Sequence, residues 1–273
     1  MMSSSASNVR GTIFSCVGKR VFITGASSGF GEHFALTFAR AGASVIALAA
    51  RRVKRLESLA KRIRALDGVE PNITVVCVAC DVSNTDSIVK AFDDAQTMGQ
   101  VDCFDVIVNN AGIGTDGKFL NVSERDYDQL MAVNVKGCWF VAQEAARRMA
   151  SCSRTGSIVN IASIYGLRVG VVHSAYAATK AAVVHMTKAM AIELLKHGIR
   201  VNCVCPGYFW TEMTTEFFSS PAGKRFAERK IPMKRLGTVG ELDGVMLLLA
   251  SNASSFMTGS IVAVDGGHLV ASL

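Results

Sequence analysis

The stretch RVFITGASSGFGEHFALTFARAG, residues 20–42, decides the fold. It starts with an apolar run typical of a buried strand, continues with Gly25, Gly29 and Gly31, and ends in a helical pattern closed by Gly42. Glycines let the backbone turn sharply and approach a ligand, and unpaired N–H groups at a helix start attract phosphate. The stretch therefore predicts a strand, a phosphate-binding turn and a helix. Its glycine spacing differs from the usual dinucleotide fingerprint, so glycines that only pack the helix against the strand are the alternative.

The same alternation of strand-like and helix-like patterns continues to the end of the chain. Such alternation is typical of βαβ units with a parallel sheet. We expect one doubly wound, Rossmann-like α/β domain at residues 18–273, with a mostly seven-stranded parallel sheet and helices on both faces. Residues 1–17 are serine-rich and predicted to be a disordered extension. The predicted strands are 20–24, 44–49, 73–79, 106–109, 157–162, 200–204 and 261–264, and the predicted helices 29–40, 53–66, 85–96, 124–150, 176–197 and 241–250.

Composition excludes several function classes. The 273 residues carry a net charge of +7, but much of the excess lies in residues 51–64, where the apolar spacing predicts an amphipathic helix with a wet basic face. This pattern argues against a nucleic-acid partner and favours an acidic small molecule or an acidic carrier protein. Apolar runs stay far below the roughly 18 residues needed for a membrane span.

The eight cysteines do not predict a metal site. Cys77 and Cys80 lie in a strand-like run, where positions three apart face opposite sides of a sheet. Cys203 and Cys205 share a face, but no histidines with ligand spacing accompany them. We therefore expect no metal, free thiols and a reducing, cytoplasmic location.

The end of the second predicted strand indicates the cofactor. NAD enzymes of this architecture usually place there an acid that binds the ribose 2′-hydroxyl. This chain has Ala50 at that place, followed by Arg51 and Arg52, which can bind a 2′-phosphate. The sequence predicts NADP(H) in preference to NAD(H). The alternative is that both arginines are only solvated residues at a helix start.

Tyr176 is the only tyrosine with a lysine four residues later, Lys180. Residues four apart share a helix face, and a nearby cation lowers the pKa of a phenol by stabilising the phenolate. Ser163 ends a predicted strand on the ligand-binding side of the sheet, where it can hold a carbonyl oxygen. Asn134 is a polar residue in an apolar run and needs partners. These residues predict a proton-transfer site.

In these motifs the chain resembles the short-chain dehydrogenase/reductase family from about residue 18 to residue 267. The resemblance implies Asn134, Ser163, Tyr176 and Lys180 as the catalytic set. It also implies that the cofactor lies against Gly25, Ser27, Ser28, Gly29, Phe30, Gly31, Arg51, Arg52, Asp81, Val82, Asn109, Ala111, Gly112, Tyr176, Lys180, Pro206, Gly207 and Thr211.

The implied reaction is hydride transfer between NADP(H) and a carbonyl or secondary alcohol, with Tyr176 as general acid/base. The substrate is left open, with a 3-oxoacyl thioester or another ketone as candidates. Residues 208–230 are predicted to form a lid over an apolar pocket or to pack against a partner subunit. The family makes a homotetramer the first expectation and a dimer the second, with Ala177, Ala181 and Ala191 at the interface. The alternatives are a non-catalytic NADP(H)-sensing or scaffold protein and an NAD-dependent alcohol dehydrogenase.

Overall fold

The computed structural model describes residues 11–114 and 117–271. Seven strands form one parallel sheet in the order β3-β2-β1-β4-β5-β6-β7, and the strand order reverses between β1 and β4. The predicted doubly wound parallel sheet is confirmed. The strands are β1 (Arg20–Thr24), β2 (Val45–Ala50), β3 (Thr74–Ala79), β4 (Val106–Asn109), β5 (Gly156–Ile161), β6 (Ile199–Pro206) and β7 (Ile261–Val264).

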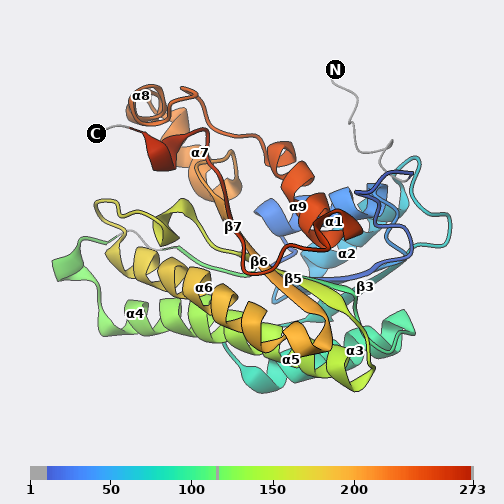
Figure 1. The fold of residues 1–273 in the computed structure, drawn as a ribbon. Helices are drawn as coiled ribbons and strands as arrows, with labels where there is room; N and C mark the ends of the chain where they lie inside the picture. Colours follow the sequence, from blue (N-terminus) through green and yellow to red (C-terminus); the bar gives the residue numbers. More distant parts are fainter. Residues whose placement is uncertain (1–10, 115–116, 272–273) are drawn as a thin grey trace.

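Helices cover both faces of the sheet (Figure 1). One face packs against α1 (Gly29–Arg40), α2 (Val53–Arg64) and α9 (Asp243–Ala250) around an apolar core that includes Phe34 and Leu249. The other face packs against α3 (Thr85–Gly99), α5 (Cys138–Ser151) and α6 (Ser174–Glu193), around a core that includes Phe22, whose ring stacks on Phe92. Burial on both faces explains why the central strands are almost purely apolar.

The helix predicted at 124–150 has an irregular centre. It consists of α4 (Glu124–Leu130), a π-helical segment at Met131–Gly137 and α5. The structure differs from the prediction because Asn134 lies in the widened turn and bonds to the backbone of a neighbouring loop at Ile113. Such π-helical turns inside α-helices are frequent at functional sites.

Two short helices lie in the segment predicted as a lid. They are α7 (Glu212–Ser219) and α8 (Pro221–Lys230), and Ser220 caps the second of them by accepting from the Gly223 N–H. Phe218, Ala227 and Ile231 form a small apolar cluster of their own. The segment therefore packs as a satellite unit beside the carboxyl ends of the strands (Figure 1).

The amino-terminal boundary differs from the prediction within the described residues. Residues 1–10 of the predicted extension lie outside the described part of the chain. Cys16, however, is fully buried, and its N–H donates to the Ala41 carbonyl at 3.0 Å. The packed region therefore starts before residue 18.

The cysteines lie as the strand patterns predict. Cys77 packs with the core on the α2 side of the sheet and Cys80 with the core on the α3 side. The Sγ atoms of Cys203 and Cys205 are 3.9 Å apart on one face of β6. All eight thiols are free. Within residues 11–114 and 117–271, every helix is too short or too polar to cross a bilayer.

Candidate active site

The glycine turn brings β1, α1 and the end of β4 into close contact. Gly25 has φ +66°, and a Cβ at Gly31 would lie 2.4 Å from the Gly25 carbonyl oxygen and 2.6 Å from Asn110 Nδ2. Only glycine fits at both positions. The side chain of Ser28, at the start of α1, makes no capping bond to the helix. The N–H groups at the start of α1 are therefore available to a phosphate.

Arg52 lies over this turn. Its Nε and Nη2 donate to Ser27 Oγ at 3.1 and 2.9 Å, and Nη2 also donates to Ser28 Oγ at 2.7 Å. The guanidinium is thus held at the entrance to the turn by neutral hydroxyls, which leave its positive charge uncompensated. That arrangement suits a phosphate group.

A cleft of about 290 Å³ follows the glycine turn along the carboxyl ends of the strands. Most of the predicted cofactor residues line it. It is lined by Gly25, Ser27, Ser28, Gly29, Phe30, Ala50, Arg51, Arg52, Cys80, Asp81, Val82, Asn110, Ala111, Gly112, Ile113, Val133, Ile161, Ala162, Tyr176, Lys180, Thr211 and Glu212. The residues fit a dinucleotide, because the phosphate-binding turn and the arginines lie at one end and Tyr176 and Lys180 lie among the other lining residues.

Other predicted cofactor residues lie outside this lining. Gly31 lies beneath the glycine turn, and Pro206 and Gly207 lie at the end of β6. Asn109 is buried, and its Nδ2 donates to the Cys138 carbonyl at 2.7 Å. Its neighbour Asn110 reaches the cleft instead, since alternate residues at a strand end point to opposite sides.

Asp81 has a fixed and charged carboxylate. Ser83 donates to Asp81 Oδ1 from Oγ at 2.7 Å and from its N–H at 3.0 Å. The Ser83 hydroxyl, and after it the Ser83 N–H and the positive charge of Arg51, hold the pKa of Asp81 below its ordinary value against the effect of burial. The carboxylate is therefore an acceptor for a ligand in the cleft.

Tyr176 and Lys180 meet as the spacing predicts. Lys180 is 5 % exposed, and its Nζ lies 5.7 Å from the centre of the Tyr176 ring. The ammonium group donates to the Ile161 carbonyl at 3.0 Å. A buried ammonium beside a phenol at a cleft is an arrangement that favours proton transfer.

Asn134 connects the π-helical segment to this pair. It is 1 % exposed; its Oδ1 accepts from the Ile113 N–H, and its Nδ2 donates to the Ile113 carbonyl and to Thr179 Oγ1. A Cβ on Gly112 would lie 3.3 Å from Asn134 Oδ1 and 3.4 Å from Lys180 Nζ. Asn134 and Lys180 therefore flank the same stretch of backbone.

Ser163 lies just past the end of β5, where its Oγ accepts from the Tyr165 N–H at 3.2 Å. The Tyr165 ring in turn lies edge-on to the Tyr176 ring, with centroids 6.2 Å apart. The turn that carries Ser163 thus packs beside the start of α6. The Ser163 hydroxyl keeps its proton available to a carbonyl oxygen.

Two further residues lie beside the site: His268, which the sequence prediction missed, and Tyr208, which was predicted only as the first residue of the lid segment 208–230. Tyr208 pairs with Tyr165 through their hydroxyls at 2.5 Å, and His268 stacks on Tyr208. A signal for Tyr208 existed, because it directly follows Pro206 and Gly207 at a strand end. His268 has no motif, since only the fold brings the carboxyl-terminal segment to this place.

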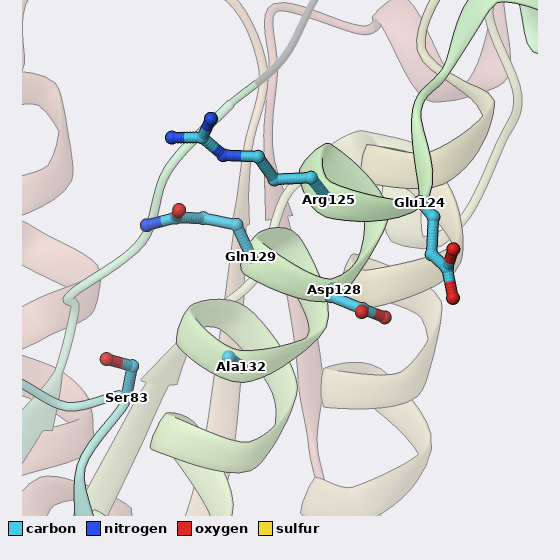
Figure 2. A pocket seen from close by; sticks show the side chains of 6 residues that line it. All are labelled: Ser83, Glu124, Arg125, Asp128, Gln129 and Ala132. Carbon is cyan, nitrogen blue, oxygen red and sulfur yellow. The ribbon is translucent and has the colours of Figure 1, made fainter.

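Two other groups contain none of the predicted site residues. Figure 2 shows an open hollow beside α4 that is lined by Ser83, Glu124, Arg125, Asp128, Gln129 and Ala132 and contains none of the predicted site residues. Asp102, Cys103 and Cys152 bring three potential metal ligands together, but Asp102 is already paired with Arg20 and Arg154. Neither group has a role in the predicted reaction.

Comparison with known proteins identifies the family. The model of a family described as enoyl-(acyl carrier protein) reductase matches residues 25–268. The chain is 38 % identical to a 3-oxoacyl-[acyl-carrier-protein] reductase FabG of Thermotoga maritima, over 93 % of this chain and 98 % of that protein. It is 40 % identical, with a TM-score of 0.85, to a solved short-chain type dehydrogenase/reductase from Mycobacterium marinum, over 94 % and 97 % of the two chains. The chain belongs to the short-chain dehydrogenase/reductase family.

Within the family, sugar-acid enzymes are similarly close. A gluconate 5-dehydrogenase of Gluconobacter oxydans is 37 % identical over 94 % of this chain and 97 % of that protein. The structure of a gluconate 5-dehydrogenase from Burkholderia cenocepacia in complex with NADP and tartrate is 33 % identical, with a TM-score of 0.88, over 95 % and 98 % of the chains. Family membership makes the chain an oxidoreductase.

Proposed function

We propose that this oxidoreductase reduces a ketone to a secondary alcohol with NADPH and catalyses the reverse oxidation with NADP⁺. The observation that carries the proposal is the buried Lys180 ammonium beside the Tyr176 ring, in the cleft that the glycine turn and Arg52 also line. The position of Arg52 over the glycine turn supports NADP(H), as does the NADP bound in a solved relative that is 33 % identical.

NADPH bound in the cleft would supply the hydride for the carbonyl carbon. Ser163 donates a hydrogen bond to the carbonyl oxygen and orients it. Tyr176 gives its phenolic proton to the same oxygen as negative charge develops there. Lys180 stabilises the resulting phenolate, since its ammonium lies beside the ring. Asn134 bonds to the backbone of Ile113 and to the side-chain hydroxyl of Thr179, so that α6 keeps its place against the cleft.

Replacing Tyr176 by Phe tests the mechanism. The phenol removed is the proposed proton donor, so kcat falls at least ~10²-fold. The rate of NADPH oxidation is measured with ketones, aldehydes, sugar acids and 3-oxoacyl thioesters as substrates. Fluorescence titration measures the Kd for NADPH, which is expected to stay the same. Tyr127→Phe is the matched control, because Tyr127 lies 44 % exposed on α4. Near-normal turnover in Tyr176→Phe contradicts the assignment.

The same panel separates the alternatives. A sensor or scaffold protein binds NADPH but oxidises it with no compound of the panel, and an NAD-dependent alcohol dehydrogenase prefers NADH. The panel includes 3-oxoacyl thioesters and keto sugar acids because relatives of nearly equal identity carry those two activities in their names. The faster class names the substrate.

We also propose a cytoplasmic homo-oligomer, a tetramer first and a dimer second. The alanines expected at the interface are mostly internal, since Ala177 and Ala191 are 6 % and 2 % exposed and only Ala181 lies at the surface. Exposed apolar side chains support the proposal instead, with Ile192 on α6 at 74 % and Leu195 just beyond it at 56 %. Light scattering that shows only monomer contradicts it.

A further inference from the structure

Tyr165 and Tyr208 meet at the ends of two adjacent strands, next to the proposed catalytic residues. Tyr165 lies two residues after Ser163, past the end of β5, and Tyr208 lies two residues after Pro206, the last residue of β6. Their hydroxyl oxygens are 2.5 Å apart, and the Tyr165 ring lies against the Tyr176 ring. The hydroxyl pair is therefore connected, through the Tyr165 ring, to the ring of the proposed proton donor.

The surroundings of this pair are aromatic. The Tyr208 ring lies 5.1 Å from the Phe218 ring and 5.2 Å from the Phe226 ring, measured between centroids. A hydrocarbon inserted between the two hydroxyls would break their hydrogen bond without replacing it, which is costly for half-buried polar groups. An oxygen atom inserted there would replace that bond, because a phenol both donates and accepts.

His268 gives a second and independent indication of a polar ligand. Its ring stacks on Tyr208, with centroids 5.5 Å apart, and it is 7 % exposed. Among the described residues it holds the one buried side-chain nitrogen or oxygen without a hydrogen-bond partner, Nδ1. Burial, together with the positive charge of Arg168, lowers the pKa of His268, so the ring is neutral near pH 7. Buried polar atoms are nearly always satisfied, so a ligand or ordered water belongs here.

We propose that Tyr165 and Tyr208 bind a second oxygen atom of the substrate, carried on the carbon next to the reacting carbonyl or on the one beyond it. The preferred substrates are then hydroxyketones and 3-oxo esters or thioesters, rather than plain ketones. This proposal rests on the proposed ketone reduction, and it identifies the two hydroxyls as the specificity-determining groups. A site built to bind an oxygen discriminates strongly against the analogue that lacks it.

The test compares three matched pairs of ketones with NADPH. They are 3-hydroxybutan-2-one with butan-2-one, 2-hydroxycyclohexanone with cyclohexanone, and ethyl 3-oxobutanoate with heptan-2-one. The quantity measured is the ratio of kcat/KM within each pair, for the wild type and for the variants Tyr165→Phe, Tyr208→Phe and Tyr127→Phe. Thermal melting of each variant checks that it is folded.

The wild type is expected to favour the oxygenated member of at least one pair by about tenfold or more. Tyr165→Phe and Tyr208→Phe each lower that ratio by roughly tenfold, while kcat/KM for the plain ketone stays within about threefold. Tyr127→Phe leaves the ratio unchanged. Because the ratio is taken within one variant, a general loss of activity does not imitate the effect.

Unchanged ratios in both folded variants overturn this proposal and leave the ketone reduction intact. The same conclusion follows if the enzyme reduces plain ketones but none of the oxygenated partners. An enzyme that binds NADPH and oxidises it with no member of this set and no compound of the larger panel overturns the proposed function, and this inference with it.

Discussion

Charged side chains are paired differently at the two ends of the strands. At the amino ends of the strands, Arg20 at the start of β1 donates to Asp105 from Nε at 2.9 Å and from Nη2 at 2.8 Å. These side chains are 11 % and 16 % exposed. Asp102 and Arg154 extend the cluster towards the surface. Every cation of this cluster faces a carboxylate.

At the carboxyl ends, two cations face neutral acceptors: Lys180, which is buried, and Arg52, which is exposed. Lys180 donates to the Ile161 carbonyl, and Arg52 to two serine hydroxyls; neither has a carboxylate at ion-pair distance within the described ranges 11–114 and 117–271. A buried charge without a counter-ion is expensive, and such groups concentrate at functional sites. The charges at the amino ends of the strands are therefore paired and stabilise the fold. The positive charges at the carboxyl ends are available to a negatively charged ligand.

Removing the Lys180 charge gives the largest expected effect on this contrast. Lys180→Met keeps the length and apolar body of the side chain but leaves the phenol without its cation, so kcat falls about 10³-fold. Lys188→Met, on an exposed position of the same helix, is the control. Rates are measured by NADPH oxidation, and melting temperatures show whether the fold is kept. If kcat of a folded Lys180→Met variant falls less than tenfold, the charge of Lys180 does not serve the reaction and the contrast between the two ends of the strands is wrong.

Asp105→Asn tests the amino ends of the strands. Breaking this largely buried pair leaves Arg20 with only the half-exposed Asp102 as counter-ion and costs about 3 kcal/mol of unfolding free energy at pH 7. Folded molecules keep their kcat/KM, because the pair is far along the strands from the cleft. Urea unfolding is the measurement, with the exposed Asp94→Asn as control. If the Asp105→Asn variant were stable but inactive, the amino ends of the strands would have a role in catalysis.

The pH dependence of that cost follows from the direction of the shift. Burial alone raises the pKa of Asp105, but the hydrogen bonds and charge of Arg20 outweigh it, so the folded-state pKa is lowered. Stability from a lowered carboxyl pKa is fully present above the unfolded value of about 3.9 and is lost as the pH falls through the folded value. The free-energy difference between wild type and Asp105→Asn is therefore constant from pH 7 to about pH 5 and shrinks below pH 4.

Arg52→Ala tests whether the charge of Arg52, at the carboxyl ends of the strands, binds the 2′-phosphate of NADPH. The loss of a charge-assisted contact to the 2′-phosphate weakens NADPH binding by roughly ten- to a hundredfold and leaves NADH binding almost unchanged. Fluorescence titration with both nucleotides measures the two Kd values. Arg62→Ala, whose side chain is 58 % exposed, is the matched control. Equal weakening for both nucleotides would mean that Arg52 only holds the serines of the turn.

The smallest effect is expected at the pair between Arg55 and Glu212, which joins α2 to the start of α7. Its side chains are 50 % and 67 % exposed, so water screens the interaction. Glu212→Gln changes the unfolding free energy by less than about 1 kcal/mol, with a melting shift of at most a few degrees. Calorimetry at low and high salt checks this result. A larger loss would show that the segment 208–230 is fixed by its charges.

The sequence predicted the sheet well because local patterns carried the information. Apolar runs of four to eight residues placed all seven strands, three of them with the observed bounds and the others with ends displaced by at most two residues. Gly25 and Gly31 marked the phosphate turn, since no other residue fits where their neighbours approach so closely. The pair Tyr176 and Lys180 was readable because both lie on one helix, where spacing fixes proximity.

Local sequence patterns did not predict three other features. The π-helical segment around Asn134 depends on hydrogen bonds to Ile113 in another loop. The lid segment was predicted by its amphipathic composition, but its division into α7 and α8 depends on the cap at Ser220. The partner of Asn109 is Cys138, 29 residues further along the chain, and no local pattern indicates it.

By itself the sequence determined the fold, the glycine turn and the pairing of a phenol with an ammonium, because each follows from spacing within one strand, turn or helix. Only the tertiary structure decided which strand-end residues reach the cleft, and it alone brought Tyr165, Tyr208 and His268 together. Their contacts join residues 43 and 60 positions apart, and packing of the sheet and helices fixes such contacts.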